Sequence, residues 1–109
     1  MKYARTLGGV ATIAAAGSTQ ATATAVTAGL TIVSTATGTT ADGVRLPASF
    51  GTGEEITIVN TTDVALDVFP STGGAINGGT ANAAKALAAN MSGRYISIGS
   101  DNWGAVLSA

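Results

Sequence analysis

The chain has 109 residues, which fits one domain, and it combines a net charge of −1 with only 10% charged residues. It contains no cluster of Lys and Arg, which argues against nucleic acid as the main partner and against an electrostatic membrane anchor. The sequence has neither Cys nor His. This excludes disulfides, most transition-metal sites and every nucleophile that depends on a histidine.

Residues 1–18 differ from the rest of the chain. A basic start is followed by a short, Gly- and Ala-rich apolar run. The same pattern is found in secretory signal peptides, and on that alternative the chain is a secreted or surface β-protein that is cleaved within 16–25. We expect instead an extended N-terminal arm over 1–18, followed by a single β domain over 19–109. No stretch approaches the roughly 18 apolar residues of a membrane span.

Alternation of polar and apolar residues recurs along the rest of the chain. It predicts strands, while Gly, Asn, Asp and Pro mark turns between them. The sequence between Glu55 and Phe69 is read as two strands joined by a hairpin turn at 60–63, whereas 81–89 fits either a helical turn or a strand. Short alternating strands with turns every 8–12 residues or so are typical of an antiparallel sandwich or barrel. The expected fold is therefore all-β, a small antiparallel β-sandwich or barrel with an extended N-terminal arm. The other predicted strands are 19–28, 30–33, 44–48, 94–98 and 103–107.

Carboxylates are the remaining candidates for chemistry. The acidic residues at 42, 63 and 101 lie in predicted turns, where Asp bonds its own backbone, and the Glu pair at 54–55 opens a strand. No Asp-x-Asp-x-Asp calcium loop is present. We therefore expect no catalytic residue, no cofactor and no metal site. The six carboxylates are Asp42, Glu54, Glu55, Asp63, Asp67 and Asp101.

Two of the few aromatic residues lie in the predicted C-terminal hairpin. Tyr95 and Trp103 could face each other there and form a platform for stacking on a sugar. Filling the core or an interface is the simpler use of these rings, because the chain has only two Phe, two Tyr and one Trp. A core this lean also favours association, since a partner buries surface that the monomer leaves exposed.

Several motifs in the second half resemble a recurrent module of tailed bacteriophages, found in small virion proteins and in tail or fibre proteins. The resemblance covers about residues 18–107, and the segment 70–79 is its most specific part. It favours a strand around Lys85 to Ala88. The motifs are Gly43-Val-Arg-Leu-Pro-Ala48, Ile56-Thr-Ile-Val-Asn60, Ala65-Leu-Asp-Val-Phe-Pro70, Ala75-Ile-Asn-Gly-Gly79, Ala86-Leu-Ala-Ala89 and Trp103.

This resemblance implies a β-rich virion protein without catalytic residues. A standalone module of this size looks like a capsid decoration (cement) protein, which commonly binds as trimers on the capsid lattice. The expected partners are then the major capsid protein and further copies of this chain in a homotrimer, with no nucleic acid and no membrane, on the capsid surface of the virion. The alternative is a tail, fibre or head-fibre module that binds a host receptor or a glycan. The expected interface residues are Tyr3, Arg5, Leu7, Val10, Ile13, Tyr95 and Trp103.

Overall fold

The computed structural model describes residues 9–38, 42–48 and 52–108. Within these ranges the chain is built from nine strands and no helix, which confirms the all-β prediction. No described helix is long and apolar enough to span a bilayer. The strands are β1 Val10–Ala14, β2 Thr24–Ala25, β3 Leu30–Thr35, β4 Gly43–Arg45, β5 Glu55–Asn60, β6 Leu66–Phe69, β7 Lys85–Leu87, β8 Ser92–Gly99 and β9 Asn102–Leu107.

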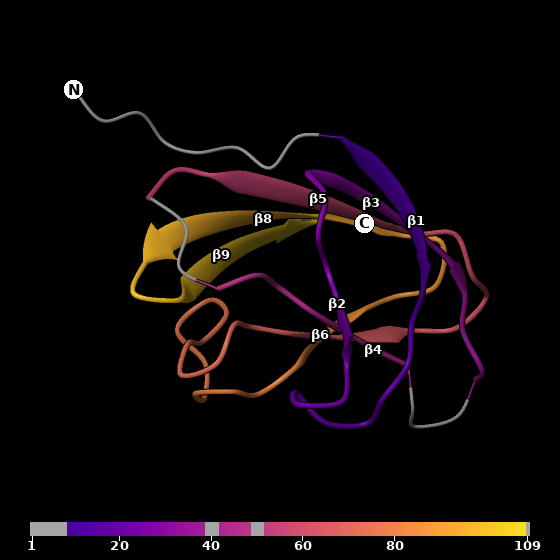
Figure 1. Ribbon diagram of the computed structural model, residues 1–109, viewed down its shortest axis with the longest axis horizontal. Helices are drawn as coiled ribbons and strands as arrows, with labels where there is room; N and C mark the ends of the chain where they lie inside the picture. Colours follow the sequence, from indigo (N-terminus) through magenta and orange to yellow (C-terminus); the bar gives the residue numbers. More distant parts are fainter. Residues whose placement is uncertain (1–8, 39–41, 49–51, 109) are drawn as a thin grey trace.

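The strands form two open sheets that lie in two layers (Figure 1). The larger sheet has the order β1-β3-β5-β8-β9, and the smaller has the order β2-β4-β6-β7. Neither sheet of the described chain closes on itself, so the barrel alternative is not found.

The prediction of an antiparallel fold is wrong for the first six strands. They alternate between the two sheets, so that β1, β3 and β5 pair in parallel in one sheet and β2, β4 and β6 pair in parallel in the other. These strands wind as three turns of a flattened coil, each turn placing one strand in each layer. Only the last three strands, β7, β8 and β9, pair antiparallel with their neighbours.

The connection after β5 shows why the expected hairpin is absent. Residues 60–63 were expected to fold β6 back onto β5, but β6 lies in the other sheet, so this segment crosses between the layers. The expected strand over 19–28 is mostly turn as well, and only Thr24–Ala25 is paired. The side chain of Thr22 bonds the backbone N–H and hydroxyl of Thr19 and holds this turn.

The part of the predicted N-terminal arm that the structure describes, residues 9–18, is not an arm throughout. Residues 10–14 form β1, which pairs with β3 from Val10 to Ala14 and so belongs to the larger sheet. This pairing makes the segment part of the sheet, although its Gly- and Ala-rich composition indicated an extended arm. The remainder of the predicted arm, 1–8, lies outside the described residues.

The core lies between the two sheets and draws on both of them. Ile56 and Ile58 of β5 point into it, as their spacing predicts, and are 1% and 0% exposed. The other fully buried large side chains of the described chain are mostly Leu and Val, together with the aromatic residues Tyr95 and Trp103. The main members are Val26, Val33, Val44, Leu46, Leu66, Val68, Ile76 and Leu87.

Candidate interaction surface

The outer face of the larger sheet is aliphatic, and none of the residues that the structure describes covers it. Strand register places Val10, Leu30, Thr57, Arg94 and Val106 in one row across all five strands. Val10 and Val106 are 65% and 56% exposed. Alternate side chains of a strand share a face, so four further aliphatic residues lie on this side. They are Ile32 of β3, Val59 of β5, and Ile96 and Ile98 of β8.

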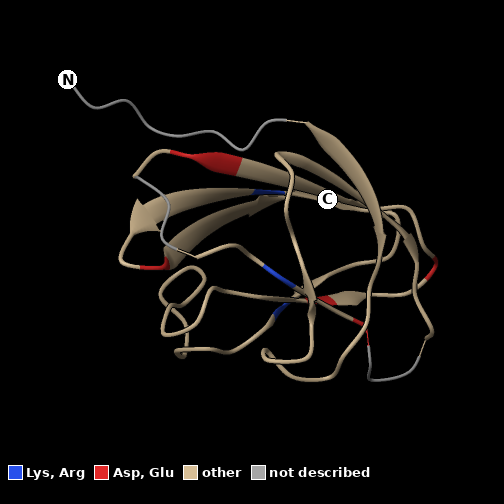
Figure 2. Cartoon of the chain, viewed as in Figure 1, with Lys and Arg blue, Asp and Glu red and all other residues tan. Residues whose placement is uncertain are grey.

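Charge on this face is limited to one opposite-sign pair. Glu55 Oε1 lies 3.5 Å from Arg94 Nε, and both side chains are about half exposed. Figure 2 shows the corresponding red stretch at the start of β5 and the blue stretch on β8, while β1, β3 and β9 have no charged residue. An exposed pair of this kind adds little stability, so its main effect is to leave the face electrically neutral.

A shallow hollow interrupts the face beside this pair. It has a volume of about 410 Å³ and is open to solvent. Thr57, Arg94 and Val106 belong to its lining, together with Ser92 at the start of β8 and Leu107 at the end of β9. An aliphatic face with such a hollow is suited to receive apolar side chains from another surface.

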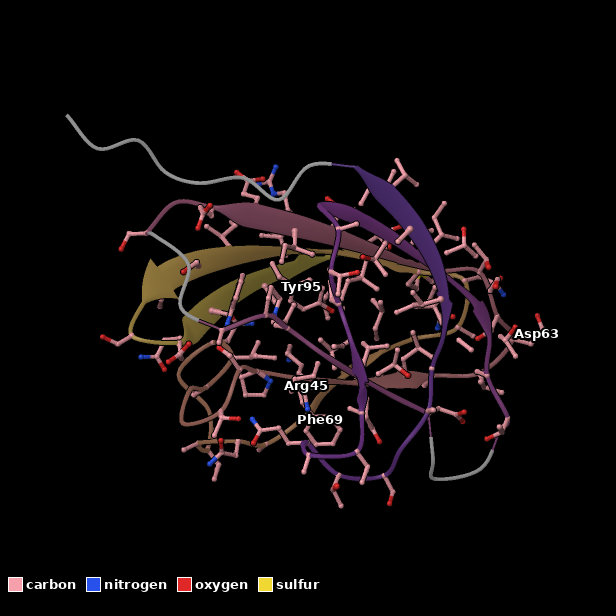
Figure 3. All side chains as sticks on the ribbon, viewed as in Figure 1. Arg45, Asp63, Phe69 and Tyr95 are labelled. Atoms are coloured by element: carbon pink, nitrogen blue, oxygen red, sulfur yellow. The ribbon has the colours of Figure 1, made fainter. Side chains whose placement is uncertain are left out.

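The outer face of the smaller sheet is covered by the chain itself. The turn that follows β1 lies over it, and the guanidinium of Arg45 donates to the backbone oxygen of Gln20 at 2.9 Å (Figure 3). The side chain of Gln20 in turn donates to the carbonyl of Pro70 at 2.8 Å. Under this turn the ring of Phe69 packs against Gly43, where a Cβ would lie 3.1 Å from the ring, and Phe69 is only 8% exposed. The turn thus covers the smaller sheet around Phe69 and Arg45, whereas no described segment covers the outer face of the larger sheet.

The two edges of the larger sheet differ in the same way. At the β9 edge, the segment 75–77 pairs with the strand, because Trp103 donates its N–H to Ala75 O and accepts from Asn77 N–H, both at 2.8 Å. The side-chain amide of Asn77 also bonds both backbone groups of Ala105. At the opposite edge, β1 is the last strand of the sheet in the described chain. In the described chain the open face therefore extends to an edge strand, β1, whose outer side pairs with no further strand.

The predicted interface residues fall into three groups. Tyr95 and Trp103 lie in the core and are 0% and 1% exposed, so neither ring can contact a partner or stack on a sugar at the surface. Val10 is on the open face, whereas Ile13 is half-buried and packs against the core. The remaining three, Tyr3, Arg5 and Leu7, lie outside the described residues.

Sequence reasoning missed the open face, although its signal is present in the strands. Leu30-Thr-Ile-Val33 has apolar residues at both odd and even positions, and Tyr95-Ile-Ser-Ile98 does the same. A strand with one solvated face alternates, whereas a strand covered on both faces is apolar throughout. The excess of aliphatic residues in these two strands therefore indicated a second buried face.

Tyr95 is held by packing and not by hydrogen bonding. Its ring lies across Gly93, where a Cβ would come within 2.7 Å of the ring and of the hydroxyl. The hydroxyl is buried and bonds no described residue. Burial raises the pKa of this phenol above its ordinary value.

We expect Tyr95→Phe to keep the free energy of unfolding unchanged or to raise it by up to about 1 kcal/mol, because it removes a buried polar group without breaking a bond. Only the unfolded chain can ionise this phenol near its ordinary pKa of about 10, so the parent should lose stability above that pH relative to the variant. Urea denaturation at neutral and alkaline pH measures both effects. A loss above about 1 kcal/mol at neutral pH would show that the hydroxyl is bonded in the native state.

Asp42 holds a turn through its carboxylate, as its sequence position predicts. Asp42 is 3% exposed and accepts bonds from the Thr37 N–H and hydroxyl and from the Gly38 N–H, at 2.6 to 3.0 Å. The carboxylate of Asp101 accepts a hydrogen bond from the hydroxyl of Ser71 at 3.0 Å. The hydroxyl oxygen of Ser71 in turn accepts from the indole N–H of Trp103. Asp63 projects from the crossover between β5 and β6 (Figure 3). In the described part of the chain no three metal-ligating side chains come together.

A second groove, of about 450 Å³, lies beside Arg45. Among the described residues that line it, Arg45 is the one with an ionisable side chain, and its guanidinium is already bonded to the backbone oxygen atoms of Gln20 and Ala21.

Comparison with known proteins gives no relative. The chain matches no family model, no curated protein and no solved structure.

Proposed function

We propose that this chain is a non-enzymatic structural protein of a bacteriophage particle, a decoration protein that binds the major capsid protein on the outer surface of the head and stabilises it. The observation that carries the proposal is the uncovered aliphatic face of the larger sheet. Monomeric proteins rarely leave such a face to water, and its presence favours a protein that works by being part of an assembly.

The phage assignment depends on the resemblance, and the structure gives its motifs physical roles. Gly43-Val-Arg-Leu-Pro-Ala48 supplies the strand whose Gly43 accommodates the ring of Phe69. Ala75-Ile-Asn-Gly-Gly79 covers the β9 edge through the side chain of Asn77. Motif residues with roles in folding support a shared architecture between this chain and the phage modules. The two layers with one common core favour a β-sandwich as that architecture.

Self-association belongs to the proposal. Association as a homotrimer would bury apolar area that a thin core lacks, and residues 1–8 would then reach the capsid or a neighbouring trimer. The alternative, a fibre or tail module that binds a glycan, loses its most direct candidate site, because Tyr95 and Trp103 are both buried.

Binding to capsids that lack this protein tests the function. We expect purified full-length chain to bind saturably to the outer surface of such capsids, and to raise the temperature at which they release their genome or disassemble. A variant without residues 1–8 should bind more weakly if the predicted arm reaches the shell. Absence of saturable binding by the full chain, together with saturable binding to host cells or a glycan, would replace the decoration role by the receptor-binding one.

A further inference from the structure

We propose that the outer face of the larger sheet packs against the same face of a second copy of this chain. This contact is two-fold, because the same surface is used by both copies, and it is therefore additional to the three-fold contacts of the homotrimer in the proposed function. It needs no capsid, and so it can fail or succeed separately from the decoration role.

The face is large enough for an interface between two copies. Five strands spaced about 4.8 Å apart give a width of about 24 Å, and strands of six residues give a length of about 20 Å. The flat footprint is therefore roughly 500 Å² per chain, or about 1,000 Å² over two copies, which reaches the size that a specific interface needs. The accessible area is larger than the footprint, because the side chains of Val10, Ile98 and Val106 project from the sheet.

The chemistry of the face favours a second copy over nucleic acid or lipid. Nucleic acid and anionic lipid would require clustered cations, and a bilayer interface would favour aromatic rings. This face has one arginine and aliphatic side chains instead. An aliphatic, neutral surface fits best against a surface of the same composition.

The charges of the face are complementary to those of a second copy. Glu55, the first residue of β5, lies beside Arg94 of the neighbouring strand β8, with 3.5 Å between Oε1 and Nε. A two-fold axis through the face brings the glutamate of one copy toward the arginine of the other, and vice versa, as a self-complementary interface requires. Both charges then keep an opposite partner, so that closing the interface leaves neither of them unpaired.

The outer face of the smaller sheet has a cover from the chain itself. The turn around Gln20 closes over Phe69 and Arg45 on that sheet. No described residue does the same for the larger sheet, whose hollow beside Thr57 and Val106 is open. A second copy supplies the aliphatic side chains that fill it.

Sedimentation velocity of the full chain over a concentration series tests the proposal. We expect an oligomer whose dissociation constant rises at least about tenfold in Val106→Lys and in Ile98→Lys, because each substitution places a cation in an apolar contact. Ala86→Lys is the matched control, since it adds the same side chain at an exposed position of β7 in the smaller sheet. It should leave the dissociation constant unchanged, and circular dichroism should confirm that all three variants are folded.

A charge-exchange experiment identifies the partner surface. Glu55→Arg and Arg94→Glu should each weaken self-association, because each variant opposes like charges across the axis. An equimolar mixture of the two should associate more tightly than either alone, since each copy then faces the opposite charge. Three results would overturn the proposal. The first is a monomer at all concentrations, which is expected if residues 1–8 cover the face. The others are an oligomer that is insensitive to Val106→Lys and a mixture that associates no better than its components.

Discussion

Asn60→Ala is expected to lower the free energy of unfolding by about 3–4 kcal/mol. The side chain is 1% exposed and lies where the chain leaves the larger sheet. Its amide nitrogen reaches the carbonyl oxygens of Val64, Leu87 and Ala88 at 2.8, 3.3 and 3.1 Å, and its oxygen accepts the N–H and hydroxyl of Thr62. One side-chain amide thus links the two crossovers between the sheets. Its loss leaves several buried polar groups without a hydrogen-bond partner.

Asn60→Asp is the matched variant, because it keeps the shape and the acceptor but loses the donor. The new carboxyl faces carbonyl oxygens, which raises its pKa above the unfolded value of about 3.9. The folded state then binds the proton more tightly, so the stability of this variant falls as the pH rises. Urea denaturation should show a smaller loss relative to the parent at pH about 4 than at pH about 8. A loss below about 1 kcal/mol for Asn60→Ala, or one independent of pH for Asn60→Asp, would contradict this role.

Gly74→Ala is expected to cost about 3–5 kcal/mol, through overpacking and through the loss of bonds that cover β9. A Cβ at this position would overlap the backbone carbonyl of Asp101 in the turn between β8 and β9. Backbone cannot move aside as a flexible side chain does. The loop must therefore shift away and weaken the contacts that Ala75 makes with Trp103 and Asn102.

Gly73→Ala is the control for this prediction. No atom lies within 4 Å of a Cβ at Gly73, and its cost comes only from a φ of +87°. We expect a loss of about 1 kcal/mol there, clearly smaller than at Gly74. Thermal or urea denaturation of the two variants measures the difference. Equal losses would show that the loop relaxes freely and that the close approach of Gly74 to the hairpin carries no stability.

Local sequence patterns were sufficient to predict the pairing of a strand with the next strand in the chain. The turn at 99–102 was predicted, and the positive φ values of Ser100 and Asp101 are those of a two-residue hairpin turn. Alternation in Glu55–Asn60 also placed Ile56 and Ile58 correctly in the core. Both features depend on residues that are close together in the sequence.

Strand partners could not be predicted in the same way. The segment 60–63 has the composition of a hairpin turn, and what makes it a crossover is the bond from Asn60 to Ala88, far along the chain. The alternating Ala and Thr of 19–28 resemble a strand, but Ala side chains bury too little area to hold it in a sheet, and the hydroxyls of Thr19 and Thr22 favour a turn. A tertiary contact thus favours the crossover, whereas local hydrogen bonds favour the turn.

The interaction surface was only partly predictable. Val10 was identified as an interface residue and lies on the open face. The burial of Tyr95 and Trp103 could not be predicted from the residue type alone, because an aromatic ring suits a core and an interface equally well. Residues such as Ile96 and Val106 were recognisable only once the strand register fixed which side chains face outward.

Counting the copies of this chain in purified phage particles tests the central claim most directly. Quantitative mass spectrometry, with the major capsid protein as internal standard, gives the ratio of the two proteins. A decoration protein follows the capsid lattice, so we predict hundreds of copies in a fixed ratio to the major capsid protein. Only a few copies up to some tens, or none in the particle, would contradict the proposed function and favour a tail or fibre module or a protein outside the virion.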